Sequence, residues 1–223
     1  MIISTRHRYI FVHIPKTGGT ALALALEARA AADDILIGDT PKALRRRGRL
    51  RGLAARGRLW KHATLGDVEG VVAQADLPGF FIFTIVRNPW DRVVSLYHWL
   101  RGQDFDHPLV QLARDLEFRA FAAAPLTGAS LRANPYAAYV TDSAGAEHCA
   151  LWLRHERLEQ DVAVLGARLG WRLALPEAVN ASPRRRDWRG YYDAQSAAAV
   201  GEACAVDIAR FGYGFDGVGT PAG

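Results

Sequence analysis

The chain has 223 residues, of which 50% are apolar and 23% charged, and its formal net charge is +5. These values are typical of a globular protein with one substantial core, so we expect a single domain over residues 1–223. Its two cysteines, Cys149 and Cys204, are too few for a disulfide framework. No run reaches the roughly eighteen apolar residues of a membrane span, and no signal peptide is evident. We therefore expect a cytoplasmic protein.

The segment Tyr9–Ala32 predicts a strand, a tight turn and a helix. Its short apolar start suits an interior strand of a parallel sheet. The Gly18–Gly19 pair lets the backbone approach a ligand closely, and the run rich in Ala and Leu favours a helix with Thr17 or Thr20 as its N-cap. N–H groups at a helix start favour an anion, and Lys16 adds a positive charge. We interpret the segment as a cradle for a phosphate-like group.

A plain strand-to-helix connection is the alternative interpretation, because such units also occur without a ligand in α/β folds. The loop that binds nucleoside triphosphates has the order G-x-x-x-x-G-K-[ST]. In this chain Lys16 precedes the glycines and no glycine opens the loop. The segment is therefore not a Walker A sequence.

A basic insertion, Lys42–Lys61, follows a short strand that we expect within Asp33–Gly38. It contains seven arginines, and no acidic residue occurs between Asp39 and Asp67. Interspersed leucines allow an amphipathic helix over part of it, but we favour a solvated basic face or mobile loop. Its electric field would attract a polyanion such as a nucleotide, an acidic glycan or a membrane surface. Asp67–Ala75 is expected to be helical.

The second strong strand is Phe80–Val86, which is apolar on both faces and therefore central in a covered sheet. Asn88 suits an N-cap and Pro89 the first helical position, so a helix follows at once. Arg87 thus emerges at the carboxyl end of a strand, where open α/β sheets bind ligands. Ser95 lies two turns along the same helix face, so one phosphate could meet both side chains. An NTPase would need an acidic residue here to hold Mg²⁺, whereas arginine indicates a direct anion site.

In the region of residues 103–148, the spacing of the apolar residues suggests helices. Within it, Pro125–Pro135 is typical of a loop. Beyond it we expect a strand over Ala150–Arg154, a helix over Glu156–Leu169 that ends at Gly170, and a last helix over Ala194–Phe211 that Gly212 stops.

Two segments together resemble the PAPS-dependent sulfotransferases, where PAPS is 3′-phosphoadenosine 5′-phosphosulfate. His13–Thr20 is similar to the family's 5′-phosphosulfate loop, and Val86–Tyr97 to its 3′-phosphate motif. The resemblance is to the carbohydrate branch, which includes the heparan sulfate 2-O-sulfotransferases and many small bacterial relatives. Asp207–Tyr213 and Asn180–Arg184 also look like this family, so the likeness extends nearly end to end. Residues 103–148 match least, and there an acceptor would be selected.

This resemblance implies a three-layer, P-loop-like α/β fold with a central, mainly parallel sheet and a cofactor cleft at the carboxyl ends of the strands. It also implies an in-line, metal-free transfer of the sulfuryl group from PAPS to a carbohydrate hydroxyl, which leaves PAP. Lys16 would assist catalysis, because a preplaced ammonium stabilises negative charge that grows on the bridging oxygen. By the same resemblance, Lys16, Thr17, Gly18, Gly19 and Thr20 would hold the 5′-phosphosulfate, Arg87 and Ser95 the 3′-phosphate, and Arg184 would also bind the cofactor.

A base must remove the acceptor proton, and a pKa near neutrality suits that task. In the carbohydrate branch the base is a histidine between the two phosphate motifs, and His62 is the only histidine there. The alternative is a surface histidine whose pKa is lowered by neighbouring cations. Asp67 could orient His62, although we favour a role as cap of the next helix. His13 and His98 are expected to pack structurally.

The acceptor is expected to be a carbohydrate or another hydroxyl compound, and the basic segments hint at an acidic one; no nucleic-acid partner is expected. The Arg184–Arg186 loop could close over the nucleotide or bind the acceptor, and Trp188 or Tyr191 could stack on adenine. Two other functions stay open. One is a nucleotide kinase or NTPase, and the other is a non-catalytic polyanion binder that uses residues 42–61 and 184–189.

Overall fold

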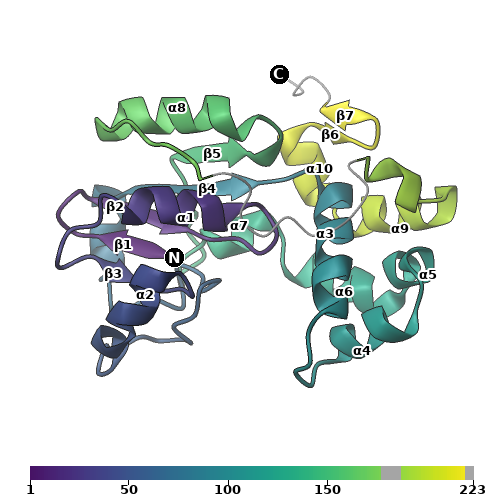
Figure 1. Ribbon diagram of the computed structural model, residues 1–223, viewed down its shortest axis with the longest axis horizontal. Helices are drawn as coiled ribbons and strands as arrows, with labels where there is room; N and C mark the ends of the chain where they lie inside the picture. The colour runs from purple at the N-terminus through teal and green to yellow at the C-terminus, as the bar shows by residue number, and fades with distance from the viewer. Residues whose placement is uncertain (177–186, 219–223) are drawn as a thin grey trace. The chain divides into compact units, whose positions relative to one another are not determined.

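The computed structural model describes residues 1–176 and 187–218 (Figure 1). Contacts within the chain group them into two units. Unit 1 comprises Met1–Val86 and Tyr136–Asn180, and unit 2 comprises Arg87–Pro135 and Ala181–Gly223. The chain thus passes twice through each unit, and each is described by itself.

Unit 1 is built on a five-stranded sheet with the strand order β3-β1-β2-β4-β5. β2 pairs in parallel with β4, and β4 with β5, whereas β1 pairs antiparallel with β2 and β3. Val12 lies opposite Thr84, and Val86 opposite Arg154, so the three parallel strands end at one edge of the sheet. The strands are β1 (Ile2–Ser4), β2 (Tyr9–Val12), β3 (Ile35–Leu36), β4 (Phe81–Val86) and β5 (Leu151–Arg154).

The core of unit 1 includes one cluster formed by this sheet with α1 (Gly19–Glu27) and α8 (Leu158–Leu169). β2 is buried along its whole length, as expected for an apolar run in a covered sheet. Leu22 and Leu26 of α1 belong to the same cluster as Phe83 of β4. The strands predicted from the apolar runs are therefore confirmed, while β1 was not predicted.

The first helix ends at Glu27, earlier than the predicted end at Ala32. Beyond the helix, the carboxylate of Asp34 accepts a hydrogen bond from the N–H of Ala31 at 2.8 Å, which closes a turn. The end of α8 is as predicted. Gly170 adopts a φ of 69°, which is the left-handed conformation that commonly terminates a helix.

The basic insertion begins with α2 (Pro41–Arg46) and the 3₁₀ helix η1 (Arg47–Leu50), so its first part is helical. Some of its cations bind backbone carbonyls. Arg46 Nη1 donates to the Ala31 carbonyl, just beyond α1, at 2.7 Å. Lys42 contacts the carbonyl of Glu27, the last residue of α1, and Arg49 contacts that of Ala32. These side chains stabilise the carbonyl-rich end of α1, where positive charge is favourable. The favoured interpretation of a solvated basic face is therefore wrong for Arg46, which is half-buried, whereas Arg49 is exposed.

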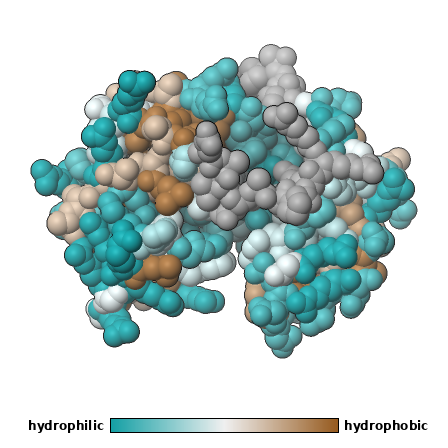
Figure 2. Space-filling view, in the orientation of Figure 1, coloured by the Kyte–Doolittle hydropathy of each residue, from teal (hydrophilic) through white to brown (hydrophobic). Residues whose placement is uncertain are grey.

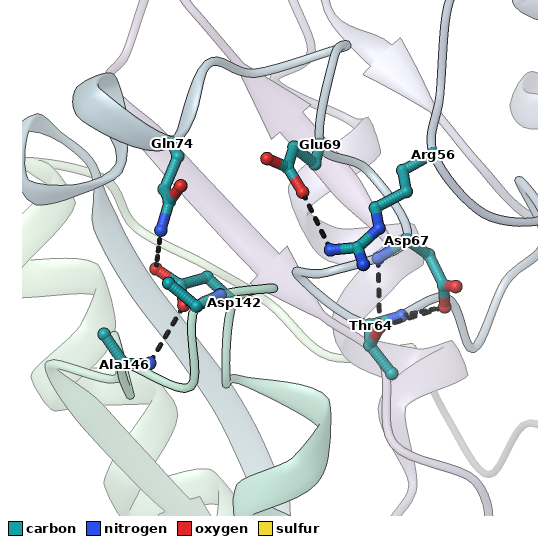
Figure 3. A network of polar contacts seen from close by, with 8 residues as sticks. Arg56, Thr64, Asp67, Glu69, Gln74, Asp142 and Ala146 are labelled. Carbon is teal, nitrogen blue, oxygen red and sulfur yellow. Dashed lines mark hydrogen bonds and ion pairs between the residues drawn. The ribbon is translucent and has the colours of Figure 1, made fainter.

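Residues 67–73 form turns rather than the predicted helix (Figure 3). The carboxylate of Asp67 accepts from the N–H and the hydroxyl of Thr64 at 2.8 and 3.0 Å, which closes a turn. Gly70 then adopts a φ of 91°, which an α-helix does not allow. Helical geometry begins only with η2 (Gln74–Gly79). Figure 3 also shows the bonds that tie the neighbouring loops together: Gln74 to Asp142 at 3.1 Å, the Ala146 N–H to Asp142 at 2.9 Å, and Arg56 to Glu69 at 3.2 Å.

Unit 2 is mainly helical, and α3 (Pro89–Arg101) forms one wall of its core. Val94 and Tyr97 of α3 pack in one cluster with Phe121 and Val200. The remaining elements of both units are α4 (Pro108–Asp115), α5 (Phe118–Ala123), α6 (Pro125–Ala133), α7 (Tyr136–Tyr139), η3 (His155–Arg157), η4 (Arg189–Tyr191), α9 (Ala194–Ala203), α10 (Ala205–Phe211), β6 (Tyr213–Gly214) and β7 (Gly217–Val218).

Two predictions in unit 2 need correction. Pro125–Pro135 was predicted as a loop, but Pro125 occupies the first position of α6, where its missing N–H costs nothing. The last helix is interrupted at Cys204, whose ψ of 16° separates α9 from α10. Its end at Gly212 is confirmed, since that glycine is the left-handed C-cap of α10.

The visible face of the molecule is mostly hydrophilic, with hydrophobic residues in scattered spots (Figure 2). Within residues 1–176 and 187–218, no helix is long and apolar enough to cross a membrane. Cys149 and Cys204 are both free thiols.

Candidate functional site

The loop between β2 and α1, His13–Gly18, carries the first motif and is called the Lys16 loop below. Lys16 itself adopts a φ of 65° and Gly18 a φ of 86°. The left-handed conformation costs a residue with a side chain about 1–2 kcal/mol, and such strain gathers at functional sites. The Thr17 hydroxyl is fully buried and donates to the Ile14 carbonyl at 2.9 Å, which closes the loop on itself.

The start of α1 has no side-chain cap. Its N-cap residue is Gly18, and its first turn contains no acidic residue. The prediction that Thr17 or Thr20 caps the helix is therefore wrong, because the Thr17 hydroxyl serves the loop instead. A helix start without a capping oxygen presents N–H groups and a positive dipole end to an anion. The start of α1 thus offers the free N–H groups that the predicted cradle requires, while the binding of an anion there stays a prediction.

Two imidazoles pack against the glycine pair of the Lys16 loop. A Cβ placed on Gly19 would overlap the ring of His13, with Nε2 at 2.6 Å, and one placed on Gly18 would lie 2.7 Å from Cδ2 of His155. The sequence alone ascribed these glycines to close approach of a ligand. In the structure the side-chain space of both is already occupied by histidine rings. His155 was not predicted, although its place directly after the strand over 150–154 was a signal.

His62 is partly buried beside the Lys16 loop. Its Nδ1 lies 2.7 Å from the carbonyl oxygen of His13, and the two imidazole centroids are 4.8 Å apart. Because a carbonyl can only accept, Nδ1 carries the proton and Nε2 keeps its lone pair. Burial, reinforced by the nearby Lys61 ammonium, lowers the pKa of His62 to about 3, although the hydrogen bond to His13 opposes the shift. The imidazole is therefore neutral at physiological pH.

His13 and Asp67, the two other side chains discussed in connection with the base, make packing and turn-closing contacts. His13 is 7% exposed, and burial followed by the His62 charge lowers its pKa well below the ordinary value. It packs on Gly19 as a neutral ring, in accordance with the predicted structural role. Asp67 accepts two hydrogen bonds from Thr64, so it closes the turn seen in Figure 3.

The second motif opens unit 2, where Arg87 directly follows β4. Its Nε and Nη2 each lie 2.7 Å from Oδ2 of Asp91, and both side chains are buried. As predicted, Asn88 caps α3 by accepting from the N–H of Trp90 at 3.1 Å, with Pro89 at the first helical position. The amide of Asn88 also donates to the Gly214 carbonyl at 2.9 Å, which fixes the helix start.

Ser95 is 8% exposed on α3, one turn beyond Asp91. Asp91 and Ser95 are four residues apart on α3, which is the spacing of neighbours on one helix face, and Arg87 lies four residues before Asp91, just ahead of the N-cap. Asp91 was not predicted as part of the site. Its position four residues after the arginine was the available signal. Arg184, the remaining predicted cofactor ligand, lies outside the described residues, as does the rest of the Arg184–Arg186 loop.

Parallel strands that end at one edge, with a loop and a helix start after β2, are the architecture of P-loop-like α/β proteins, whose strand ends bind anions. This confirms the predicted fold class. A sequence model described as "Sulfotransferase family" matches residues 1–123, which is more than half of the chain and includes both motifs. The chain belongs to the sulfotransferase family.

A comparison with solved structures supports the fold. One matching structure is the crystal structure of mouse sulfotransferase SULT7A1 complexed with PAP, with 16% sequence identity and a TM-score of 0.52. The match covers 92% of this chain and 86% of that chain. Identity this low indicates a shared fold only. A comparison with curated proteins gave no match.

Proposed function

We propose that this protein transfers the sulfuryl group of PAPS to a hydroxyl of a carbohydrate acceptor. The observation that carries the proposal is the Lys16 loop, in which a lysine holds a left-handed conformation next to a helix start without a side-chain cap. The sulfotransferase family supplies the reaction class. The residues fit an anionic cosubstrate, since the N-cap Gly18 has no side chain and the first turn of α1 contains no acidic residue.

The 5′-phosphosulfate is assigned to Lys16, Thr17, Gly18, Gly19 and Thr20. The Lys16 ammonium and the N–H groups at the start of α1 would stabilise negative charge that develops on the bridging oxygen in the transition state. Because the loop fixes the backbone N–H groups at the helix start before the reaction, these groups need little reorganisation. In this proposal Thr17 contributes through its backbone, as its hydroxyl is already bonded to Ile14. The transfer needs no metal ion.

The 3′-phosphate is assigned to Arg87 and Ser95, with Arg184 as a further ligand from the family resemblance. Asp91 holds two nitrogens of the Arg87 guanidinium and thereby sets its orientation. A planar guanidinium fixed in this way binds a phosphate with geometric specificity. The proposal treats both units as parts of one sulfotransferase domain.

The catalytic base in this proposal is His62. Its Nδ1 donates to the His13 carbonyl, so Nε2 is the atom that would accept the proton of the acceptor hydroxyl. A pKa of about 3 makes the isolated site a weak base, which differs from the near-neutral value expected from the sequence. Negative charge brought by the cosubstrate would raise that pKa, because an anion nearby favours the protonated imidazole. In the same proposal, the acceptor binds to residues 103–148. The protein is proposed to act in the cytoplasm.

The test is sulfate transfer from labelled PAPS to a panel of neutral and acidic glycans, together with calorimetry that compares PAP with AMP. We expect labelled product, tighter binding of PAP than of AMP, and loss of transfer in Lys16→Ala. Arg47→Ala, which removes one exposed positive charge from the same unit, is the control and should retain activity. Turnover of ATP with Mg²⁺ would instead indicate the kinase alternative. Salt-sensitive binding of polyanions with no preference for PAP over AMP would indicate a non-catalytic binder.

A further inference from the structure

His155 occupies a position that neither the motifs nor the proposed mechanism uses. It is the first residue after β5, and β5 ends beside β4 with Arg154 opposite Val86. The carboxyl end of β5 therefore lies at the same sheet edge as the end of β2, from which the Lys16 loop emerges. Strand ends at this edge are where α/β sheets place ligand-binding residues.

The imidazole of His155 reaches the Lys16 loop itself. A Cβ on Gly18 would lie 2.7 Å from Cδ2 and 3.3 Å from Nε2 of His155, so the Cδ2–Nε2 edge of the ring faces the loop backbone. Gly18 is the N-cap of α1, and the ring thus lies next to the helix start. The side chain is only half-buried, which leaves part of it accessible to a ligand in the loop.

The segment that carries His155 is held on both sides. The N–H of Arg154 donates to Oδ2 of Asp161 at 2.6 Å, and Arg157 pairs with Oδ1 of the same carboxylate at 3.0 Å. Asp161 lies in the first turn of α8, where a negative charge is favourable. The two contacts with Asp161 hold the residues on both sides of His155 and thereby position its imidazole, as precise ligand contacts require.

We propose that His155 binds the 5′-anionic group of the nucleotide, with Nε2–H as a hydrogen-bond donor alongside the Lys16 ammonium and the start of α1. This inference rests on the proposed function, because it assumes that the Lys16 loop holds the 5′-phosphosulfate. An imidazole suits the position because it donates as a neutral ring and adds positive charge when protonated. A purely structural role would be to pack on Gly18.

The experiment measures the contribution of the 5′-phosphate to affinity in wild type and in two variants. Calorimetry gives the ratio of the dissociation constants of adenosine 3′-phosphate and PAP, two ligands that differ only in the 5′-phosphate. His155→Phe keeps an aromatic ring against Gly18 without a donor, and His155→Gln keeps a donor. We expect Phe to reduce the ratio roughly tenfold or more, as for a lost hydrogen bond to a charged group, and Gln to reduce it less. Affinity for adenosine 3′-phosphate should stay within about twofold of wild type, as expected for sites without shared partners.

His7→Gln is the matched control, because His7 is an exposed histidine of the same unit that contacts Trp171. It should leave the ratio unchanged. An unchanged ratio in His155→Phe, or an equal loss of affinity for both ligands, would overturn the inference. A wild-type protein that binds neither ligand would instead refute the proposed function.

A measurement on the unmutated protein covers the case in which the variants do not fold. Hydrogen–deuterium exchange at the imidazole carbon between the two ring nitrogens, followed by mass spectrometry, reports each histidine separately. PAP should slow exchange at His155 more than adenosine 3′-phosphate does, and His7 should not respond. Equal exchange at His155 with both ligands would contradict the proposal.

Discussion

Nε and Nη2 of Arg87 both lie 2.7 Å from one oxygen atom, Oδ2 of Asp91. This pair is buried at the start of α3, where the Asp91 carboxylate is also favoured by the helix dipole. Arg87, which lies just before the helix, is therefore oriented by a residue in the first turn of α3 before any ligand binds. The relationship gives Asp91 a positioning role in the proposed 3′-phosphate site.

Asp91→Ala is expected to weaken discrimination between PAP and AMP and to destabilise the fold. Removing one partner of a buried ion pair leaves an uncompensated charge, at a cost of roughly 3–5 kcal/mol. Asp91→Asn keeps the shape and one acceptor, so it should lose less stability while still relaxing the preference for PAP. Urea unfolding and calorimetry measure the two effects. Asp76→Asn, at an exposed position of η2, is the control, and full PAP preference in Asp91→Asn would contradict the positioning role.

Lys16→Gly and Lys16→Ala should separate the two properties of Lys16, its charge and its backbone strain. Both variants should lose about a hundredfold or more in transfer rate, because both remove a preorganised positive charge. Glycine accepts a φ of 65° without strain, so Lys16→Gly should be more stable than Lys16→Ala by about 1 kcal/mol. Thermal unfolding and initial rates test this. Equal stability of the two variants would argue against strain at this residue.

Gly19→Ala should destabilise the protein by about 1–3 kcal/mol, because its Cβ would overlap the buried ring of His13 and overpacking has this cost. The backbone of Gly19 is helical, so the effect isolates the steric contact from any requirement for a left-handed conformation. Gly48→Ala is the matched control, since nothing lies within 4 Å of a Cβ at that position. If denaturation showed both variants to be as stable as wild type, the packing of His13 on Gly19 would be refuted.

His62 should make the stability of the ligand-free protein dependent on pH. Its pKa falls from 6.5 to about 3 on folding, so between these values the unfolded chain binds more protons than the folded one. The stability due to a neutral His62 is therefore complete above about pH 6.5 and is lost as the pH falls toward 3.

His62→Asn should reduce the loss of stability between pH 7 and pH 4.5 in urea unfolding experiments. The loss should not disappear, because the pKa of His13 is lowered in the same direction. His7→Asn, at an exposed position, should leave the loss as it is in wild type. A pH dependence of His62→Asn identical to that of wild type would show that His62 titrates normally.

The local features of this protein follow from its sequence because their causes are local. The apolar runs of β2 and β4 form buried strands, Asn88 and Pro89 start α3, and Gly170 ends α8, each through backbone propensities and hydrogen bonds that span a few residues. The two motifs and the order of the elements that carry them were likewise readable, and the family match includes both.

The tertiary structure decided what depends on burial and on contacts between distant residues. Parallel pairing of β4 with β5 brings His155 next to Gly18, and the ring of His13 packs in the space that a side chain on Gly19 would fill. Desolvation lowers the pKa of His62 to about 3, below the near-neutral value that suits a catalytic base. Periodicity cannot reveal these relationships, because the free energy of a buried charge or a close contact is fixed only when the chain has excluded water and placed remote segments together.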